Sequence, residues 1–103
     1  MKYIVKLSTQ ANEDIKEIYE YIANILCEKE IASNTVSLFE KNILSLSEMP
    51  GRCRIYESEP WQSRGVHIMS VKNYLIFYVI NEEEKTVNIL RVLYGSRDID
   101  NVL

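Results

Sequence analysis

The sequence has little glycine, proline, cysteine or histidine, and each shortage excludes a class of site. Its 103 residues include three glycines, two prolines, two cysteines and one histidine. Neither Cys27 nor Cys53 has a second cysteine at metal-ligand spacing, so we expect no zinc site. His67 is the single histidine, and there is neither a Ser-His-Asp set nor a glycine-rich phosphate loop. The sequence therefore predicts no metal and no cofactor.

Long apolar runs and a surplus of positive charge are also missing. No segment approaches the length of a membrane span, and the N-terminal residues do not form a signal peptide. We therefore expect a cytoplasmic protein with no membrane partner. The net charge of −3 gives the whole chain no electrostatic preference for nucleic acid. With 47% hydrophobic and 26% charged residues, the composition is that of one folded domain covering residues 1–103.

The spacing of the apolar residues predicts the element order β-α-α-β-β-β. Alternation at every second residue indicates strands, and spacings of three and four indicate two amphipathic helices. Because a short polar break joins the helices, we expect a helix hairpin packed on one face of a small antiparallel sheet, an α+β fold. The predicted elements are an edge strand at residues 3–7, helices at about 10–27 and 32–46, and strands at 66–71, 74–80 and 86–94.

The last two predicted strands organise the chain. Residues 74–80 are all apolar or aromatic, which is typical of a central strand covered on both faces. The polar turn at 81–85 is too short for a crossover, so the next strand should return as a hairpin. Arg91 is the one charged side chain in that strand. Since an unpaired buried charge is costly, we expect Arg91 to lie on a solvated face or to reach an acidic group.

Polar side chains that could form a site gather in the second half of the chain. If the last strands form a meander, several of them should converge on the sheet face that the helices leave uncovered. These residues also have structural interpretations. The arginine of the tail can anchor the chain terminus, the histidine can be a surface residue, and the tyrosine can lie at the rim of the core. The candidates are Arg64, His67, Lys72, Arg91, Tyr94 and Arg97.

Several stretches resemble the RelE/ParE superfamily of toxins from bacterial toxin–antitoxin modules. They are DIKEIYEYIA in the first helix, SLSEMPG at the end of the second, and the block NYLIFYVINEEEKTVNILRVLYGSRD. With the element order, they are most similar to the ParE-like, plasmid-stabilisation branch, over nearly the whole chain. The resemblance implies a small cytoplasmic toxin that inhibits growth and is held inactive in a hetero-oligomer with a cognate antitoxin.

The branches of this superfamily differ in their targets. The resemblance implies that RelE-like members cut mRNA on the ribosome, using basic side chains and a Tyr or His. It implies that the first ParE-like members studied act on DNA gyrase. Arg97 falls on the basic position that RelE-like nucleases use after the last strand. Leu75 and Leu103 fall where such nucleases carry an arginine and a tail tyrosine, and His67 falls where close relatives commonly carry arginine.

We predict a ParE-like toxin that is not an enzyme and that binds a macromolecular target through Arg64, Arg91 and Arg97, with DNA gyrase as the candidate target. The alternative is a ribosome-dependent mRNA endoribonuclease whose catalytic residues are Arg97, Arg91, His67 and Tyr94. Attack by a 2′-hydroxyl needs groups that accept and donate protons, and only His67 and Tyr94 qualify near the basic residues. A third hypothesis is a degenerate member that only binds antitoxin.

Overall fold

The computed structural model describes residues 2–95 together with Ile99 and Leu103, and it confirms the predicted element order and the α+β fold. The second half of the first predicted helix differs, because its final turns are π-helical. The elements are β1 (Ile4–Leu7), α1 (Thr9–Glu20), the π-helical segment η1 (Tyr21–Ile25), α2 (Lys29–Ser45), the 3₁₀ turn η2 (Pro50–Arg52), β2 (His67–Val71), β3 (Tyr74–Asn81) and β4 (Thr86–Tyr94).

The four strands form one sheet in the order β1-β4-β3-β2. The hairpins β2-β3 and β3-β4 are antiparallel, as predicted. However, β1 pairs parallel with β4, from Ile4 opposite Thr86 to Leu7 opposite Ile89, so the sheet is mixed and not antiparallel throughout. The reason is that the hairpin with β3 fixes the direction of β4, while the long connection through the helices allows either direction beside β1. The expected edge position of β1 and internal position of β3 are confirmed.

Ser8 connects the end of β1 to the start of α1. Its backbone N–H donates to the carbonyl of Ile89 at 2.9 Å, which prolongs the parallel ladder by one bond. Its side-chain oxygen accepts from the backbone N–H of Ala11 at 2.9 Å and donates to the carbonyl of Leu90 at 2.9 Å. Ser8 is therefore the N-cap, and it fixes the first turn of α1 against β4.

The helical residues end at Ile25, slightly before the predicted end at about Cys27, and the last of them form a π-helical turn. The backbone N–H of Leu26 donates to the carbonyl of Tyr21 at 3.1 Å, five residues earlier. Cys27 then takes a left-handed backbone with φ of 56°, and Glu28 donates to the carbonyl of Ile22. A left-handed residue after the last helical turn is a common C-cap, usually a glycine, but here the bond from Glu28 reaches back six residues, one more than in a Schellman motif.

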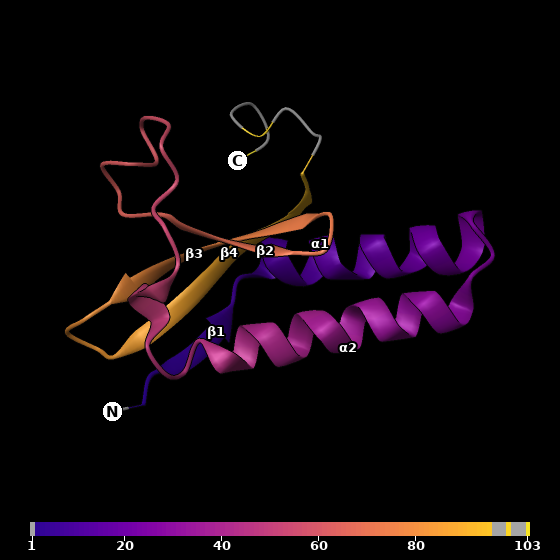
Figure 1. Cartoon of the computed structure of the whole chain (residues 1–103), viewed down its shortest axis with the longest axis horizontal. Coiled ribbons are helices and arrows are strands. Elements are labelled where there is room, and N and C mark those ends of the chain that lie inside the picture. The colour runs from indigo at the N-terminus through magenta and orange to yellow at the C-terminus, as the bar shows by residue number, and fades with distance from the viewer. Residues whose placement is uncertain (1, 96–98, 100–102) are drawn as a thin grey trace.

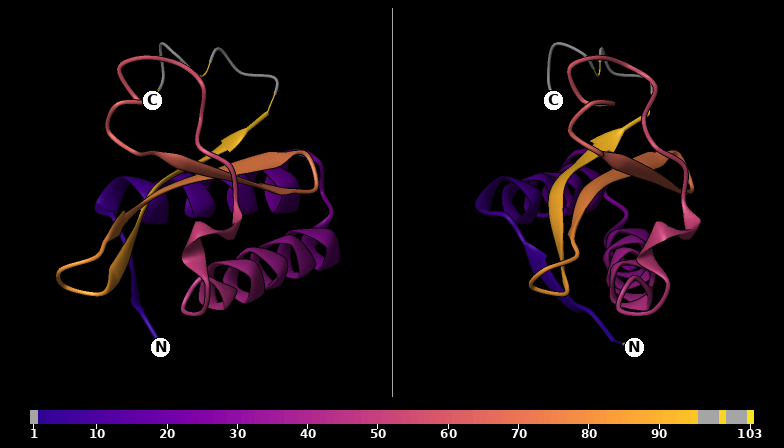
Figure 2. Two further views of the ribbon diagram at one scale, coloured as in Figure 1. Left: turned by 60° about the vertical axis from the view of Figure 1, so that its left-hand side comes forward. Right: turned by 90° about the vertical axis from the view of Figure 1, so that its left-hand side faces the viewer.

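The helix hairpin covers one face of the sheet, as predicted (Figures 1 and 2). Apolar side chains of both helices meet the sheet in one buried cluster, whose centre is fully excluded from solvent. Burial of this apolar area is the main stabilising term of the fold. The helix hairpin contributes Ala11, Phe39, Ile43 and Leu46 to the cluster. The strands contribute Met69, Val71, Ile76, Tyr78, Val87, Ile89 and Val92.

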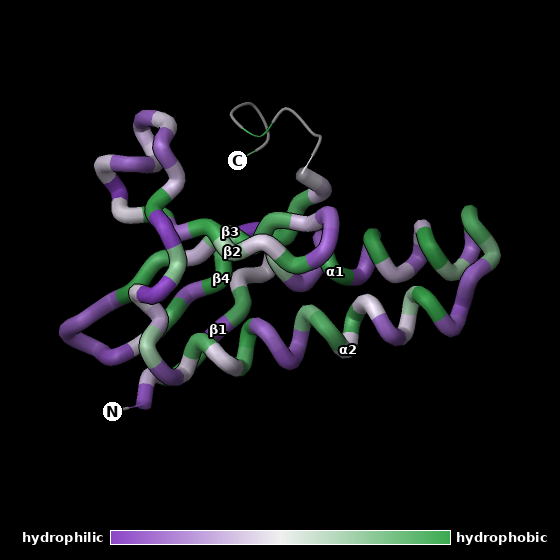
Figure 3. The backbone as a smooth tube through the Cα atoms, viewed as in Figure 1, coloured by the Kyte–Doolittle hydropathy of each residue, from purple (hydrophilic) through white to green (hydrophobic). Residues whose placement is uncertain are grey.

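The opposite face of the sheet is also apolar and covered, which corrects the expectation of an uncovered polar face. The long loop between η2 and β2 lies over this face, and Ile99 and Leu103 pack there too (Figure 2). Phe77 on β3 is fully buried, with its ring edge-on to Tyr56 of the loop at 5.4 Å. Most residues of this loop are hydrophilic (Figure 3). A second small core therefore occupies the place where a cationic patch was predicted.

The helix hairpin reaches beyond the sheet at the end where α1 passes into η1 and α2 begins (Figure 1). Several large apolar side chains of this projecting part are exposed, among them Tyr21, Ile25, Leu26 and Ile31. None of the helices that the structure describes is long and apolar enough to cross a membrane. The exposed apolar surface therefore lies on an amphipathic hairpin whose outer half has no sheet against it.

Candidate functional site

Arg91 reaches an acidic group, one of the two outcomes that its sequence context predicts. Its Nε donates to Oδ2 of Asp14 at 2.8 Å and its Nη2 donates to Oδ1 at 3.0 Å. The same Oδ2 also accepts from the backbone N–H of Val92 at 3.0 Å. The side chains of Arg91 and Asp14 are 17% and 4% exposed, so the pair is largely removed from water. The hydrogen bonds that Arg91 donates to Asp14 raise the pKa of Arg91 above its ordinary value.

Asp14 is the partner that the sequence analysis missed. A carboxylate this early in a helix is explained by the helix dipole alone, and its partner lies 77 residues further along the chain. One signal was present: Asp14 follows Ala11 by three residues and precedes Ile18 by four, which places it within the buried stripe of α1. A carboxylate in such a stripe needs a cation, and Arg91 was the one charged residue of the last strand.

His67 lies in β2 against the helix-side core. Its ring stacks on that of Tyr78, with 5.2 Å between centroids and 20° between planes, and its Nδ1 lies 3.1 Å from the carbonyl oxygen of Gly65. Tyr78 is fully buried and donates its hydroxyl to the carbonyl of Pro50 at 2.6 Å. Burial raises the pKa of Tyr78. His67 therefore covers a buried tyrosine.

Tyr94 lies at the other end of the sheet from His67. It pairs with Tyr74 on β3, whereas His67 pairs with Tyr78, four residues further along the same strand. At a rise of about 3.3 Å per residue, the two positions are separated by roughly 13 Å along β3 alone. The two predicted proton carriers are therefore not brought to one reaction centre.

The remaining candidates are also dispersed. Arg64 lies on the loop, with its guanidinium 5.2 Å from the centre of the Trp61 ring. Lys72 occupies the turn between β2 and β3 with φ of 55° and lines a shallow hollow beside Tyr94. Arg97 falls outside the residues that the structure describes. Leu75, at a position that the resemblance links to a nuclease arginine, packs in the second apolar cluster.

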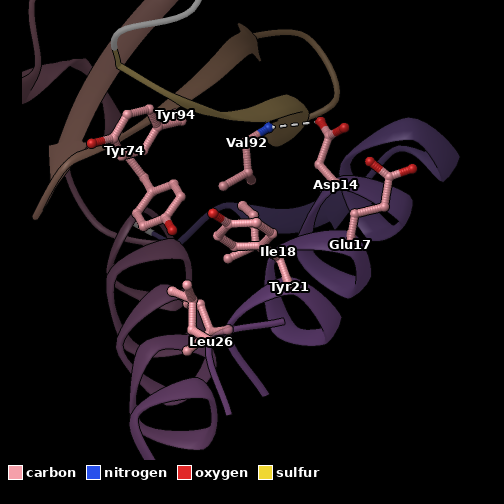
Figure 4. Close-up of a pocket in the computed structure, with 9 residues that line it drawn as sticks. Asp14, Glu17, Ile18, Tyr21, Leu26, Tyr74, Val92 and Tyr94 are labelled. Atoms are coloured by element: carbon pink, nitrogen blue, oxygen red, sulfur yellow. Dashed lines mark hydrogen bonds between the residues drawn. The ribbon is translucent and has the colours of Figure 1, made fainter. Parts of the chain in front are cut away.

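A hollow lies where the helix hairpin leaves the sheet (Figure 4). Its cavity volume is about 640 Å³, within the usual range of ligand-sized pockets. We call it the tyrosine groove. It is lined by Asp14, Glu17 and Ile18 of α1, Tyr21 and Ile22 of η1, Leu26, Tyr74 of β3, and Val92 and Tyr94 of β4.

Three tyrosines give the groove its character. The rings of Tyr74 and Tyr94 lie edge to face with centroids 5.5 Å apart, and Tyr21 points toward Tyr74 from the opposite wall (Figure 4). The pKa of Tyr74 is raised, first by burial and then by the proximity of Tyr94 and Tyr21. Tyr21 and Tyr94 remain 54% and 44% exposed. Sequence analysis missed Tyr21 and Tyr74 as groove residues because each fits the apolar pattern of its own element.

The groove has the chemistry of a binding surface. Its wall is aromatic and aliphatic. Its two carboxylates belong to Asp14, which accepts hydrogen bonds from Arg91, and to Glu17 at the exposed rim. Within residues 2–95, Ile99 and Leu103, no group of three or more His, Cys, Asp or Glu could hold a metal ion. The arrangement can hold a partner segment through apolar contact and a rim charge.

Comparison with known proteins gives a family and a fold. Residues 5–99 match the family described as the ParE toxin of the type II toxin–antitoxin system parDE. No curated protein matches the sequence. The fold is similar to that in the chromosomal ParDE toxin–antitoxin system from P. aeruginosa, at a TM-score of 0.73 and 20% identity, with 90% of this chain and 96% of that chain covered.

Two further solved structures have the same fold. The toxin–antitoxin complex RelBE2 from Mycobacterium tuberculosis is similar at a TM-score of 0.65 and 24% identity, covering 91% of this chain and 99% of that chain. The archaeal RelE-RelB complex from Pyrococcus horikoshii OT3 is similar at 0.65 and 16% identity, covering 94% and 99%. At these identities the likeness extends to the fold alone.

Proposed function

The chain belongs to the ParE toxin family of type II toxin–antitoxin systems, and on this premise we propose that it inhibits growth by binding a macromolecular target, not by cutting RNA. DNA gyrase is the target that we propose to test first, and the cytoplasm is the compartment where this target would be met. Arg64 and Arg97 are the proposed target-binding cations. A cognate antitoxin would neutralise the toxin in a hetero-oligomer.

The pairing of Arg91 with Asp14 is the observation that carries this proposal. A nuclease arginine must offer its guanidinium to a phosphate whose charge grows in the transition state. In this chain both oxygens of Asp14 accept hydrogen bonds from Arg91, and the pair is largely buried. Contact with phosphate would require breaking a desolvated ion pair, which costs several kcal/mol. Arg91 is therefore better suited to fixing α1 on β4 than to catalysis.

The positions of the possible proton carriers also favour binding over cleavage. RNA cleavage needs an acceptor for the 2′-hydroxyl proton and a donor for the leaving oxygen around a single phosphate. His67 stacks on the buried Tyr78, and Tyr94 lies at the other end of β3 beside Tyr74. One phosphate group cannot contact both side chains across that distance.

The antitoxin partner is supported by the family and by exposed apolar surface. Two of the structurally similar proteins are described as toxin–antitoxin complexes. On this chain, Tyr21, Ile25 and Leu26 of the projecting hairpin are 54%, 68% and 51% exposed. Contiguous apolar surface of this kind on a small domain is typical of a protein–protein interface.

The deciding experiment compares two activities of the purified chain. We expect inhibition of DNA supercoiling by gyrase, reversed by the product of the adjacent reading frame, and no cleavage of mRNA in a translating extract. Ribosome-dependent mRNA cleavage would replace this proposal with the endoribonuclease hypothesis. Antitoxin binding with neither activity and no growth arrest on induction would leave the degenerate member.

A further inference from the structure

We propose that the tyrosine groove receives an arginine side chain of the antitoxin, carried on an apolar segment that covers the projecting helix hairpin. This inference rests on the proposed function, because it takes the antitoxin as the partner. In this proposal the groove recognises a cation, which the aromatic rings and a carboxylate of the groove bind. Three observations on the described residues support it: the charge of the lining, the arrangement of the rings, and the continuity of the apolar surface.

The charge of the groove favours a cation. Its nine lining residues include two carboxylates, Asp14 and Glu17, and no lysine or arginine. Asp14 is paired with Arg91, whose guanidinium also interacts electrostatically with Glu17, and the Glu17 carboxylate lies at the exposed rim within reach of a ligand. A cationic side chain approaching this wall is attracted, and an anionic one is repelled.

The rings of the groove also favour a cation. Aromatic faces carry negative charge density, and sites that surround a cation with several aromatic rings bind it through this quadrupole. Tyr74 and Tyr94 lie edge to face at 5.5 Å, and Tyr21 stands opposite them across the groove (Figure 4). Arginine fits such a site better than lysine, because its planar, weakly hydrated guanidinium stacks on rings while its N–H groups bond a carboxylate.

The groove volume leaves room for more than one side chain. A cavity of about 640 Å³ is larger than an arginine side chain needs, and its floor is formed by the aliphatic Ile18, Ile22 and Val92. Leu26 on the groove wall and Ile25 beside it continue the apolar surface onto the outer half of the hairpin. The arginine is therefore flanked by apolar side chains on the same partner segment, as in an interface whose anchor lies at the centre of an apolar patch.

The π-helical segment gives this wall its shape. Within η1 the hydrogen bond from Leu26 spans five residues back to Tyr21, so the turn is wider than in an α-helix. Such turns inside helices are frequent at functional sites. Here the turn places Tyr21 and Ile22 on the groove and leaves Tyr21 54% exposed, although Ile22 is buried. The buried side chain of Ile22 thus anchors the turn that carries the exposed ring of Tyr21.

The test uses the complex with the product of the adjacent reading frame and measures its dissociation constant. Glu17→Gln removes the rim charge without changing shape, and we expect binding about tenfold weaker, with the difference shrinking as salt increases. Tyr21→Leu keeps apolar bulk but removes the ring, and we expect about fivefold weaker binding. Glu20→Gln and Tyr19→Leu are matched controls on α1 outside the groove lining, and they should leave the constant unchanged.

A double-mutant cycle identifies the partner residue. Each arginine of the antitoxin is replaced by leucine and measured against the wild type and Glu17→Gln, and we expect one arginine whose loss costs much less in the Glu17→Gln background. This inference alone is overturned if both groove variants leave the dissociation constant as unchanged as the controls do. It is also overturned if no antitoxin arginine is coupled to Glu17. Failure of the unaltered proteins to form any complex instead removes the antitoxin partner from the proposed function.

Discussion

The carboxylate of Asp14 accepts hydrogen bonds from two neighbouring residues of β4, through the guanidinium of Arg91 and the backbone N–H of Val92. Its Oδ2 accepts from Arg91 Nε at 2.8 Å and from Val92 at 3.0 Å. β1 pairs with β4 only as far as Ile89, so the carboxylate takes up a strand N–H just beyond the last β1 residue. The ion pair thus closes part of a sheet edge and joins α1 to β4 in one contact.

Removing this contact should destabilise the domain strongly. For Asp14→Asn we expect a loss of about 3 kcal/mol in the free energy of unfolding, because the largely buried ion pair between Asp14 and Arg91 would be broken. Urea unfolding measures the difference. Glu13→Gln, one residue earlier on the exposed side of α1, is the control and should change stability by less than about 0.5 kcal/mol. Equal effects of the two changes would contradict a structural role for the pair.

Phe77 tests the second core, between β3 and the long loop. The side chain is fully buried, so Phe77→Ala should cost roughly 3–5 kcal/mol, enough to unfold a domain of this size. Glu83→Ala at the exposed β3-β4 turn provides the comparison. Thermal melting of both variants is the measurement, and matching melting temperatures would mean that the loop does not cover this face.

Stability should fall in alkaline solution through Tyr78. Burial raises the pKa of Tyr78 above its ordinary value of 10.0, so the folded state holds the phenolic proton more tightly than the unfolded state. This contribution is complete below about pH 10 and is lost as the pH rises above it. Tyr78→Phe should therefore lose less stability than the wild type between about pH 9 and pH 11.

The same variant has a cost near neutral pH. Without the hydroxyl, the carbonyl of Pro50 loses a 2.6 Å hydrogen bond in a buried setting, which should cost about 1–3 kcal/mol. Denaturant midpoints at several pH values separate the two effects. An alkaline slope as steep in Tyr78→Phe as in the wild type would assign the loss to other groups, with Tyr74 the first candidate because burial also raises its pKa.

His67 should matter for stability and not for toxicity. His67→Ala removes a ring stacked on Tyr78 and should lower the free energy of unfolding by about 1 kcal/mol, the usual worth of an aromatic pair. His67→Phe keeps a ring and should recover most of it. Growth arrest should persist in both variants, whereas a proton-transfer role would slow the reaction by a hundredfold or more.

Arg97 distinguishes binding from catalysis most directly. If it binds the target, Arg97→Ala should weaken target binding in proportion to the loss of growth arrest. If it stabilises a transition state, the same change should abolish cleavage and leave binding of ribosomes or RNA intact. Binding of the target and of ribosomes by the purified variant, measured beside its activity, separates these outcomes. Lys72→Ala is a cation control on a turn that the structure describes.

Much of the fold was predictable because its signals are local. Ser8 caps the first helix as its residue type predicts, and the apolar spacing from Ala32 to Leu46 matches α2 and its end. The direction of β1 was not predictable, because β1 and β4 are far apart in sequence and no turn fixes their pairing. The π-helical turn after Glu20 was equally hidden, since the apolar spacing of Ile18, Ile22 and Leu26 fits an α-helix.

The candidate site was harder to predict than the fold, because it depends on contacts between distant elements. Arg91 was marked correctly as a residue in need of an acid, but Asp14 could be recognised as its partner only from the packing of α1 on β4. Tyr21 and Tyr74 each fitted an apolar pattern, and their convergence depends on how far the helices project past the sheet. Arg64, His67 and Lys72 were grouped by sequence position, yet they belong to separate surroundings in the fold.

The parallel pairing of β1 with β4 has a consequence during protein synthesis. Ser8 and Leu90, which join where the two strands separate, are 82 residues apart in the chain. A ribosome adding about 5–20 residues per second needs roughly 4–16 s to make the second after the first. Until then β1 has no neighbour, Asp14 has no arginine, and the groove has no β4 wall. The tyrosine groove is thus completed late in translation, after both helices of the hairpin have been made.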